Sequence, residues 1–327
     1  MVVGATSATR WDFEDLAAWL ISRGVKVGPE QTVVDLKRYV EAPLIPVARM
    51  LALDGLRVHG RGDLGQGIAL ISWNDVPETP ATRIVEARFR DSFDGKHPSA
   101  ALVQEMGRAK RHLSPGEEWT PWDEEKIRDA LLCVGIVVPC SPIPLVSWLQ
   151  FPEWAPTRGV GFTIGLPHLE GRRRNDGWST EHGPVAADVF ARFRALPSAQ
   201  REALRVPLQR LASAMRAWST VDSAIDLGIA LEALLLADTD TSELTFKLRL
   251  RVSRYLEPAG AGRERFFDAV RDLYAIRSTA VHRGHLPDTF KARPTTEILE
   301  DGYRVVARAL RRMIADGIPD WKAVELG

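Results

Sequence analysis

Arg277 and His282 are the residues whose types and spacing best suit chemistry in this chain. They lie five positions apart in the segment Leu273-Tyr-Ala-Ile-Arg277-Ser-Thr-Ala-Val-His282-Arg-Gly284. A guanidinium holds phosphate oxygens with forked donors, and an imidazole exchanges a proton near neutral pH. These are the two groups that metal-independent cleavage of an RNA phosphodiester needs most. The spacing alone proves nothing, because about one such pair is expected by chance in so arginine-rich a chain.

The surrounding residues predict an amphipathic helix that ends at Gly284. Apolar residues recur there at three- and four-residue steps, at Phe266, Val270, Leu273 and Val281. This pattern is typical of one buried stripe, and Arg277 falls on that stripe. A charge that faces a core must be paired or must perform a function. A buried salt bridge that only shapes the helical bundle is therefore the competing explanation.

The expected partner of Arg277 is Glu232, in the apolar run from Val221 to Leu236. Glu232 is the only ionisable group in the last two turns of this predicted central helix. Because a buried carboxylate is costly unless a cation pairs with it, we expect Glu232 to contact Arg277. His282 lies about 140° around a straight helix from Arg277, so the two side chains would not be adjacent. Either the helix end bends at Arg283-Gly284, or a second copy of the chain completes the site.

Taken in order, these segments resemble the Apea-like HEPN domains of bacteria, a branch of the HEPN superfamily. The resemblance covers roughly Gly183 to Asp316 and rests on Ile229-Ala-Leu-Glu232-Ala-Leu, on the spacer Glu243 to Arg254 and on Leu273 to Gly284. The Arg-x4-6-His signature of the family maps onto Arg277 and His282. Ser278 follows the arginine where HEPN ribonucleases commonly have Asn, Asp or His. This departure bears on catalysis more than on fold.

The resemblance implies an all-α bundle that pairs as a homodimer around an RNA cleft. A ribose 2′-hydroxyl would attack the adjacent phosphorus and leave a 2′,3′-cyclic phosphate and a 5′-hydroxyl. Two copies of His282 would act as acid and base, and two copies of Arg277 would hold the phosphate. Ser278, Glu232 and His285 would support them, and the reaction requires no metal or cofactor.

The implied setting is a toxin or phage-defence ribonuclease acting on single-stranded or tRNA-like RNA. An antitoxin or another defence-system protein would then be a partner. The alternative is a catalytically silent HEPN module that binds RNA, a nucleotide or a protein.

Length and composition predict a two-domain α+β chain. The 327 residues suit two domains of ordinary size, and contents of 45% hydrophobic and 26% charged residues are ordinary. We expect a mixed α/β domain of unknown role over residues 1–182 and an all-α HEPN domain over residues 183–327. With 43 basic and 43 acidic residues the net charge is zero, which argues against strong non-specific duplex binding. A small RNA cleft is not excluded.

The chain carries no segment typical of a membrane span or an export signal. Its first residues lack a basic start followed by an apolar core, and no uncharged run is long enough to cross a bilayer. We therefore expect a soluble cytoplasmic protein without a membrane partner. Cys133 and Cys140 are expected to be reduced core thiols, with a disulfide as the minor alternative.

Residue patterns also predict the elements of each domain. In the first half they indicate helices at 13–21, 33–40, 100–112 and 123–130, and strands at 47–53, 67–73, 131–138 and 159–165. In the second half they indicate helices at 185–196, 199–217, 221–236, 243–256, 263–282 and 296–316, with Pro207 breaking or bending the second of these. Gly60–Gly65 matches Gly-x-Gly-x-x-Gly. Because a strand follows where a dinucleotide site needs a helix, we expect a hairpin loop.

Other candidate sites are weaker. Arg172, Arg173 and Arg174 precede Trp178, and such groups together can clamp single-stranded nucleic acid, although tryptophans near strands are more often core. Arg283 is a further candidate RNA contact. The last predicted helix exposes Arg304, Arg308, Arg311 and Arg312, either as a solvated face or along an RNA approach. A zinc site at His282, His285 and Asp288 would lack a fourth ligand nearby.

Overall fold

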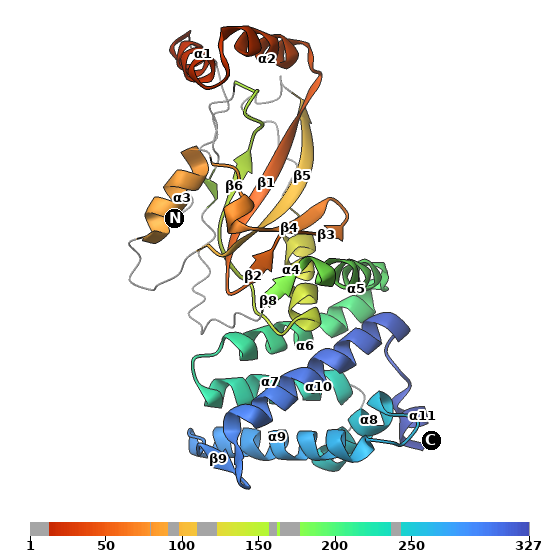
Figure 1. Cartoon of the computed structure of the whole chain (residues 1–327). Helices are drawn as coiled ribbons and strands as arrows, with labels where there is room; N and C mark the ends of the chain where they lie inside the picture. The colour runs from red at the N-terminus through yellow and green to blue at the C-terminus, as the bar shows by residue number, and fades with distance from the viewer. Residues whose placement is uncertain are drawn as a thin grey trace. The chain divides into compact units, whose positions relative to one another are not determined.

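The computed structural model describes residues 13–78, 80–90, 98–109, 123–156, 162–163, 177–236 and 243–326 (Figure 1). The chain divides into two units: the first takes residues 1–123 and 143–167, and the second takes residues 124–142 and 168–327. This division differs from the boundary expected at residue 182, because residues 124–142 and 168–182 belong to the second unit. The mixture of helices with an antiparallel sheet agrees with the expected α+β class.

The first unit is built on an antiparallel sheet with the strand order β3-β4-β5-β1-β6-β7. Its strands are β1 (Leu44–Asp54), β3 (Arg61–Gly65), β4 (Ile68–Ser72), β5 (Ala100–Ala109), β6 (Ile143–Gln150) and β7 (Phe162–Thr163); β2 (Arg57–His59) lies outside this sheet. In the centre, Leu51 of β1 lies opposite Leu102 of β5 and Ser147 of β6. The consecutive residues Met50 to Leu53 are all buried, so both faces of β1 are covered.

The described residues of the first unit form the helices α1 (Phe13–Val27), α2 (Pro29–Glu41) and α3 (Pro80–Arg90), with a 3-10 turn at Trp73–Asp75. Gly28 joins α1 to α2 at φ 86°, a left-handed conformation that suits glycine. Arg23 of α1 pairs with the buried Asp35 of α2 at 2.7 Å. Both predicted N-terminal helices are confirmed, and both are longer than expected.

Two sequence predictions for the first unit are wrong. The segment predicted as a helix from residue 100 is strand β5. It pairs with β4 on one side and with β1 on the other, and this pairing overrides the helix propensity of its Ala, Leu, Gln and Glu residues. The predicted loop Gly60–Gly65 is mostly the edge strand β3, with Gly62 and Leu64 buried. The hairpin turn instead lies at Gln66-Gly67, where both φ angles are positive. No helix begins at Gly65, so the nucleotide-binding alternative gains no support.

The second unit is mainly helical. Its helices are α4 (Glu124–Val137), α5 (Gly183–Ala195), α6 (Ser198–Arg216), α7 (Thr220–Leu235), α8 (Leu244–Leu256), α9 (Arg263–Arg283), α10 (Thr295–Asp316) and α11 (Trp321–Leu326). Short strands are β8 (Gly177–Ser179), β9 (Thr289–Phe290) and β10 (Arg293–Pro294). The apolar helix α7 packs against α6, α9 and α10, as expected of a central helix (Figure 1). Leu227, Leu231 and Leu235 are fully buried there.

The six predicted helices of the second half are confirmed to within two residues at each end. Helix α6 runs unbroken through the buried Pro207, so the predicted break is absent. Helix α11 was not predicted. The strand predicted at residues 131–138 is wrong, since most of this segment belongs to α4, and Ala130, Cys133 and Val134 are fully buried. An apolar run buried on most sides has no periodicity that distinguishes a helix from a strand.

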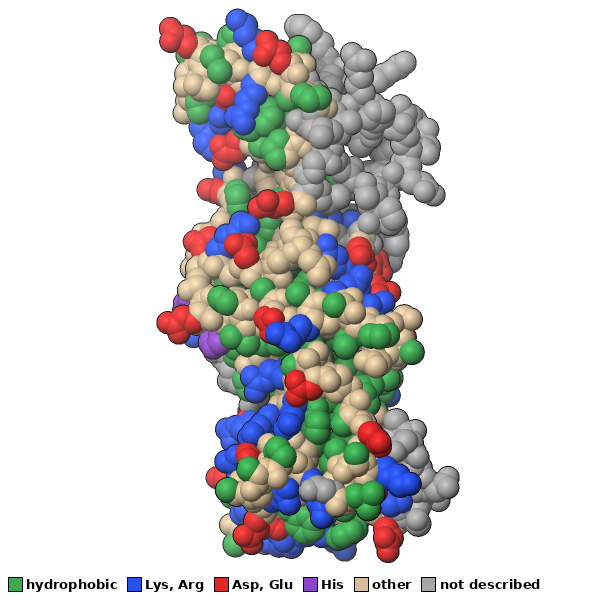
Figure 2. Space-filling view, turned by 90° about the vertical axis from the view of Figure 1, so that its right-hand side faces the viewer, with side chains coloured by type: hydrophobic (Ala, Val, Ile, Leu, Met, Phe, Trp, Pro, Cys, Tyr) green, Lys and Arg blue, Asp and Glu red, His purple; other side chains and the backbone are tan. Residues whose placement is uncertain are grey.

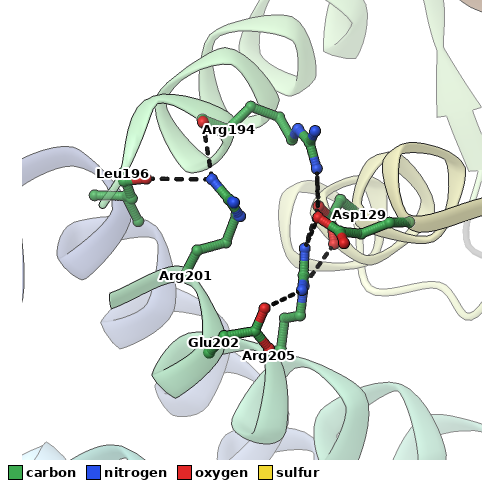
Figure 3. Close-up of polar contacts among 7 residues, drawn as sticks. Asp129, Arg194, Leu196, Arg201, Glu202 and Arg205 are labelled. Carbon is green, nitrogen blue, oxygen red and sulfur yellow. Dashed lines mark hydrogen bonds and ion pairs between the residues drawn. The ribbon is translucent and has the colours of Figure 1, made fainter. Parts of the chain in front are cut away.

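A buried carboxylate explains why α4 joins the second unit. Asp129 is fully buried, and its two oxygens accept hydrogen bonds from Arg205 Nε and Nη2, both at 3.0 Å (Figure 3). Arg194 Nη1 adds a third at 2.8 Å. These arginines lie on α5 and α6, so α4 cannot leave the second unit without exposing two cations and losing the partners of a carboxylate.

Candidate functional site

Arg277 and Glu232 form the ion pair that the sequence predicts. Arg277 Nη2 lies 3.1 Å from Glu232 Oε1 and 3.3 Å from Oε2. The side chains are 24% and 29% exposed, so the pair is half-buried at the contact between α9 and α7. The predicted contact is confirmed. A half-buried pair remains open to a ligand, whereas the Asp129 carboxylate is fully buried.

Tyr274 also binds Glu232, and the sequence analysis did not identify it. Its hydroxyl donates to Glu232 Oε1 at 2.9 Å, and its ring centroid lies 5.4 Å from Arg277 Cζ. Burial, with the hydrogen bond to Glu232, raises the pKa of Tyr274 above its ordinary value, so the hydroxyl stays a donor at neutral pH. Its position three residues before Arg277 was the available signal, because such residues share a helix face.

Gly228 of α7 provides the surface on which the stem of Arg277 lies. A Cβ at position 228 would stand 2.5 Å from Arg277 Cγ, closer than real Cβ contacts essentially ever come, and 3.2 Å from Cδ, which is tighter than most. Glycine inside a helix costs about 1 kcal/mol relative to alanine. Its occurrence one turn before Glu232 was a sequence signal for close approach, and the sequence analysis missed it.

The guanidinium of Arg277 is only partly used. Its hydrogen bond to Glu232 is made through Nη2, while Nε is buried and has no hydrogen-bond partner among the described residues. A guanidinium carries five N–H donors, so this group retains capacity for another acceptor. Because Nε is buried and Nη2 is bound to Glu232, Nη1 is the donor through which the arrangement can hold an anionic oxygen without giving up Glu232.

His282 stands in the last turn of α9 and is exposed. The helix stays regular to Arg283 and ends at Gly284, whose φ is 68° and whose N–H donates to the Ala280 carbonyl at 2.9 Å. The helix therefore continues without a break through His282. Five helical residues place it about 7.5 Å along and 140° around from Arg277, so one chain does not bring the two side chains together.

The remaining predicted site residues differ in their exposure to solvent. Ser278 is half-buried, whereas Arg283 and His285 are exposed. Arg172, Arg173 and Arg174 lie outside the described residues. Trp178 is fully buried, which agrees with a core role and excludes it as an exposed stacking surface.

No metal site is formed at the possible zinc ligands His282, His285 and Asp288. Within the ranges that the structure describes, no group of three or more His, Cys, Asp or Glu side chains is placed to hold a metal ion. Cys133 and Cys140 are both buried and form no disulfide with each other, as expected of core thiols. Burial raises the pKa of the Cys133 thiol well above its ordinary value, which keeps it protonated.

The arginines of α10 mostly stabilise neighbouring elements. Arg308 Nη2 donates to the Leu256 carbonyl at 3.2 Å and pairs with Glu257 at 3.0 Å, and Arg312 donates to the Tyr255 carbonyl. They satisfy carbonyls at the C-terminus of α8, where cations are favourable. Arg304 pairs with Asp301 at 3.2 Å. Figure 2 shows Lys and Arg side chains with Asp and Glu among them on the side that carries α8 and α11. The contacts therefore favour a structural role over an RNA approach.

Comparisons with known proteins found no match for this chain. No family model matches the chain, and neither does a curated protein nor a solved structure. In the described part of the chain, no helix combines the length and apolar content needed to cross a membrane.

Proposed function

We propose that this protein is a metal-independent endoribonuclease of the HEPN type, with Arg277 and His282 at its site. The observation that carries the proposal is their placement on α9: Arg277 is held by Glu232 with donors to spare, and His282 is exposed in the last turn. A phosphate ligand and a proton-transfer group thus lie within two turns of one helix. The segment resemblance to Apea-like HEPN domains supports the same assignment.

The reaction assigns one role to each group. One imidazole of His282 accepts the proton of a ribose 2′-hydroxyl as that oxygen attacks the adjacent phosphorus. The bond to the 5′-oxygen breaks, and a second imidazole donates the proton that this leaving group takes. Arg277 stabilises the charge on the phosphate oxygens.

A second copy of the chain supplies the second imidazole. Because α9 is regular through His282, one chain cannot place Arg277 and His282 side by side, and a two-fold dimer brings two sets into one cleft. Val281, the residue before His282, is 49% exposed, which suits coverage by another copy. An antitoxin or defence-system protein as a further partner belongs to the same proposal.

The direct test is cleavage of end-labelled single-stranded RNA and tRNA in EDTA. We expect wild-type protein to leave 2′,3′-cyclic phosphate ends, and His282→Ala and Arg277→Ala to lose on the order of 10²–10⁴-fold in rate. His59→Ala is the matched control, since His59 is an exposed histidine in the first unit. Equal cleavage by wild type and His282→Ala would exclude His282 as acid or base.

Mixing experiments test the shared cleft. If one cleft needs two copies of His282, a fourfold excess of His282→Ala leaves about one fifth of the activity of a fixed amount of wild type after subunit exchange. A mixture that retains full activity would show that each copy acts independently.

The second candidate is a catalytically silent module that binds RNA. It is favoured by the engagement of Arg277 with Glu232 and by Ser278 after the arginine. RNA that stays intact with every variant, while Arg277→Ala weakens RNA binding, would establish this function instead of the nuclease.

A further inference from the structure

The hydroxyl of Tyr274 and the guanidinium of Arg277 both donate to the carboxylate of Glu232. We propose that Tyr274 is a positioning residue: it holds Glu232 Oε1 so that Glu232 anchors Arg277 through Nη2 alone and leaves the guanidinium open to a phosphate oxygen. This inference rests on the proposed function, because it assigns Tyr274 to the same site. Neither the sequence motif nor the resemblance assigns a role to this residue.

The first step concerns the orientation of the carboxylate. A glutamate facing a lone arginine favours the bidentate arrangement, in which two parallel N–H···O bonds occupy two nitrogens. Here Glu232 instead shares its oxygens between two donors of α9. Tyr274 Oη donates a hydrogen bond to Oε1 at 2.9 Å. Arg277 Nη2 lies 3.1 Å from Oε1 and 3.3 Å from Oε2. Glu232 therefore contacts one nitrogen of the guanidinium rather than two.

The second step concerns the arginine itself. Its stem lies on Gly228, the Tyr274 ring lies beside Cζ, and Nε is buried without a partner in the described residues. These contacts prevent Arg277 from moving to meet Glu232. Nη1 is then the nitrogen best placed to donate to a ligand. If the Tyr274 hydroxyl is removed, Glu232 can rotate onto Nη1 and compete with the phosphate.

A purely structural tyrosine would behave differently. It would lower activity only as far as it lowers stability, and no second substitution at Glu232 would restore activity. The positioning role instead predicts that the loss in Tyr274→Phe comes from the negative charge of Glu232. Removing that charge with Glu232→Gln should then restore function in the double variant.

The experiment compares Tyr274→Phe with a matched control, Tyr303→Phe. Tyr303 also donates its hydroxyl within the second unit, to the buried Ala214 carbonyl at 3.1 Å. At a temperature where every variant is folded, we expect Tyr274→Phe to lose about tenfold in kcat/KM and Tyr303→Phe to match wild type. Tyr274→Phe/Glu232→Gln should recover most of the loss. Equal activity in Tyr274→Phe and wild type, or no recovery in the double variant, would overturn the proposal.

A second measurement separates this inference from the nuclease itself. An all-deoxy single-stranded oligonucleotide has no 2′-hydroxyl to attack, so its affinity reports on Arg277 without cleavage. We expect weaker binding by Tyr274→Phe and recovery in the double variant. If wild type cleaves no RNA but this binding pattern holds, the nuclease fails while the control of Arg277 by Tyr274 stands. Unchanged binding in Tyr274→Phe, or no binding by wild type, would contradict the role of Tyr274.

Discussion

Two ion-pair networks in the second unit are built from the same chemical groups but differ in burial and in how fully their donors are used. Around Asp129 the carboxylate is fully buried, Arg205 donates to both of its oxygens and Arg194 donates to one of them (Figure 3). Around Arg277 the pair is about a quarter exposed, and the buried Nε has no hydrogen-bond partner among the described residues. A completed, buried network fixes helices in place, whereas an incomplete and accessible one retains donors for a ligand.

The largest expected effect is on the Asp129 network. Asp129→Ala leaves Arg194 and Arg205 without their buried partner, so we expect a loss of about 3–5 kcal/mol in the free energy of unfolding. Urea denaturation measures it. The control is Asp188→Ala, which removes an exposed pair with Arg192 and should cost less than about 1 kcal/mol. Similar losses in both variants would mean that burial does not distinguish the networks.

Gly228→Ala should have an intermediate effect. Overpacking of this kind costs about 1–3 kcal/mol, partly offset by the better helix propensity of alanine, about 1 kcal/mol. Its matched control is Gly24→Ala in α1, where the nearest atom to an added Cβ is Thr32 Oγ1 at 3.9 Å. Thermal unfolding should show Gly228→Ala destabilised and Gly24→Ala neutral or stabilised. The reverse order would show that Arg277 can move away from α7.

Glu232→Ala should cost less stability than Asp129→Ala. The pair is partly solvated, so about 1 kcal/mol is expected in the same urea assay. Glu232→Ala should also weaken oligonucleotide binding, and this loss should be easier to detect than the loss of stability, because Arg277 loses its anchor. A stability loss as large as that of Asp129→Ala would identify the Arg277 network as an ordinary structural pair.

The smallest effect concerns pH. Hydrogen bonds from Arg205, the larger cause, and from Arg194 hold the pKa of the Glu125 carboxyl below its ordinary value. A carboxyl with a lowered folded pKa contributes stability above its unfolded pKa, and loses that contribution as the pH falls through the folded value. We therefore expect the stability difference between wild type and Glu125→Gln to be constant near neutrality and to disappear on acidification below the ordinary glutamate pKa. A difference unchanged at low pH would contradict the ion pair.

The sequence predicted the helices of the second unit well because each buries one stripe against its neighbours. It also predicted the contact of Glu232 with Arg277, since a lone carboxylate in an apolar helix needs a cation. It failed at β5, where pairing with strands distant in sequence decides the conformation, and at residues 131–138, which lack a distinguishing period. The roles of Tyr274 and Gly228 depend on which faces of α7 and α9 meet. Likewise, Arg308 and Arg312 donate to the end of α8, a location that no local pattern contains.

The insertion of residues 143–167 between α4 and the rest of the second unit has a consequence for synthesis on the ribosome. Asp129 is synthesised before Arg194 and Arg205. Helix α4 therefore lacks these two partners while β6, a strand of the first unit that pairs with β1, emerges. The second unit therefore begins before the first is finished, and it is completed only after residue 167 has closed the first unit, whereas successive domains usually fold as separate units. A fragment that begins at residue 183 would carry both arginines and never receive their carboxylate.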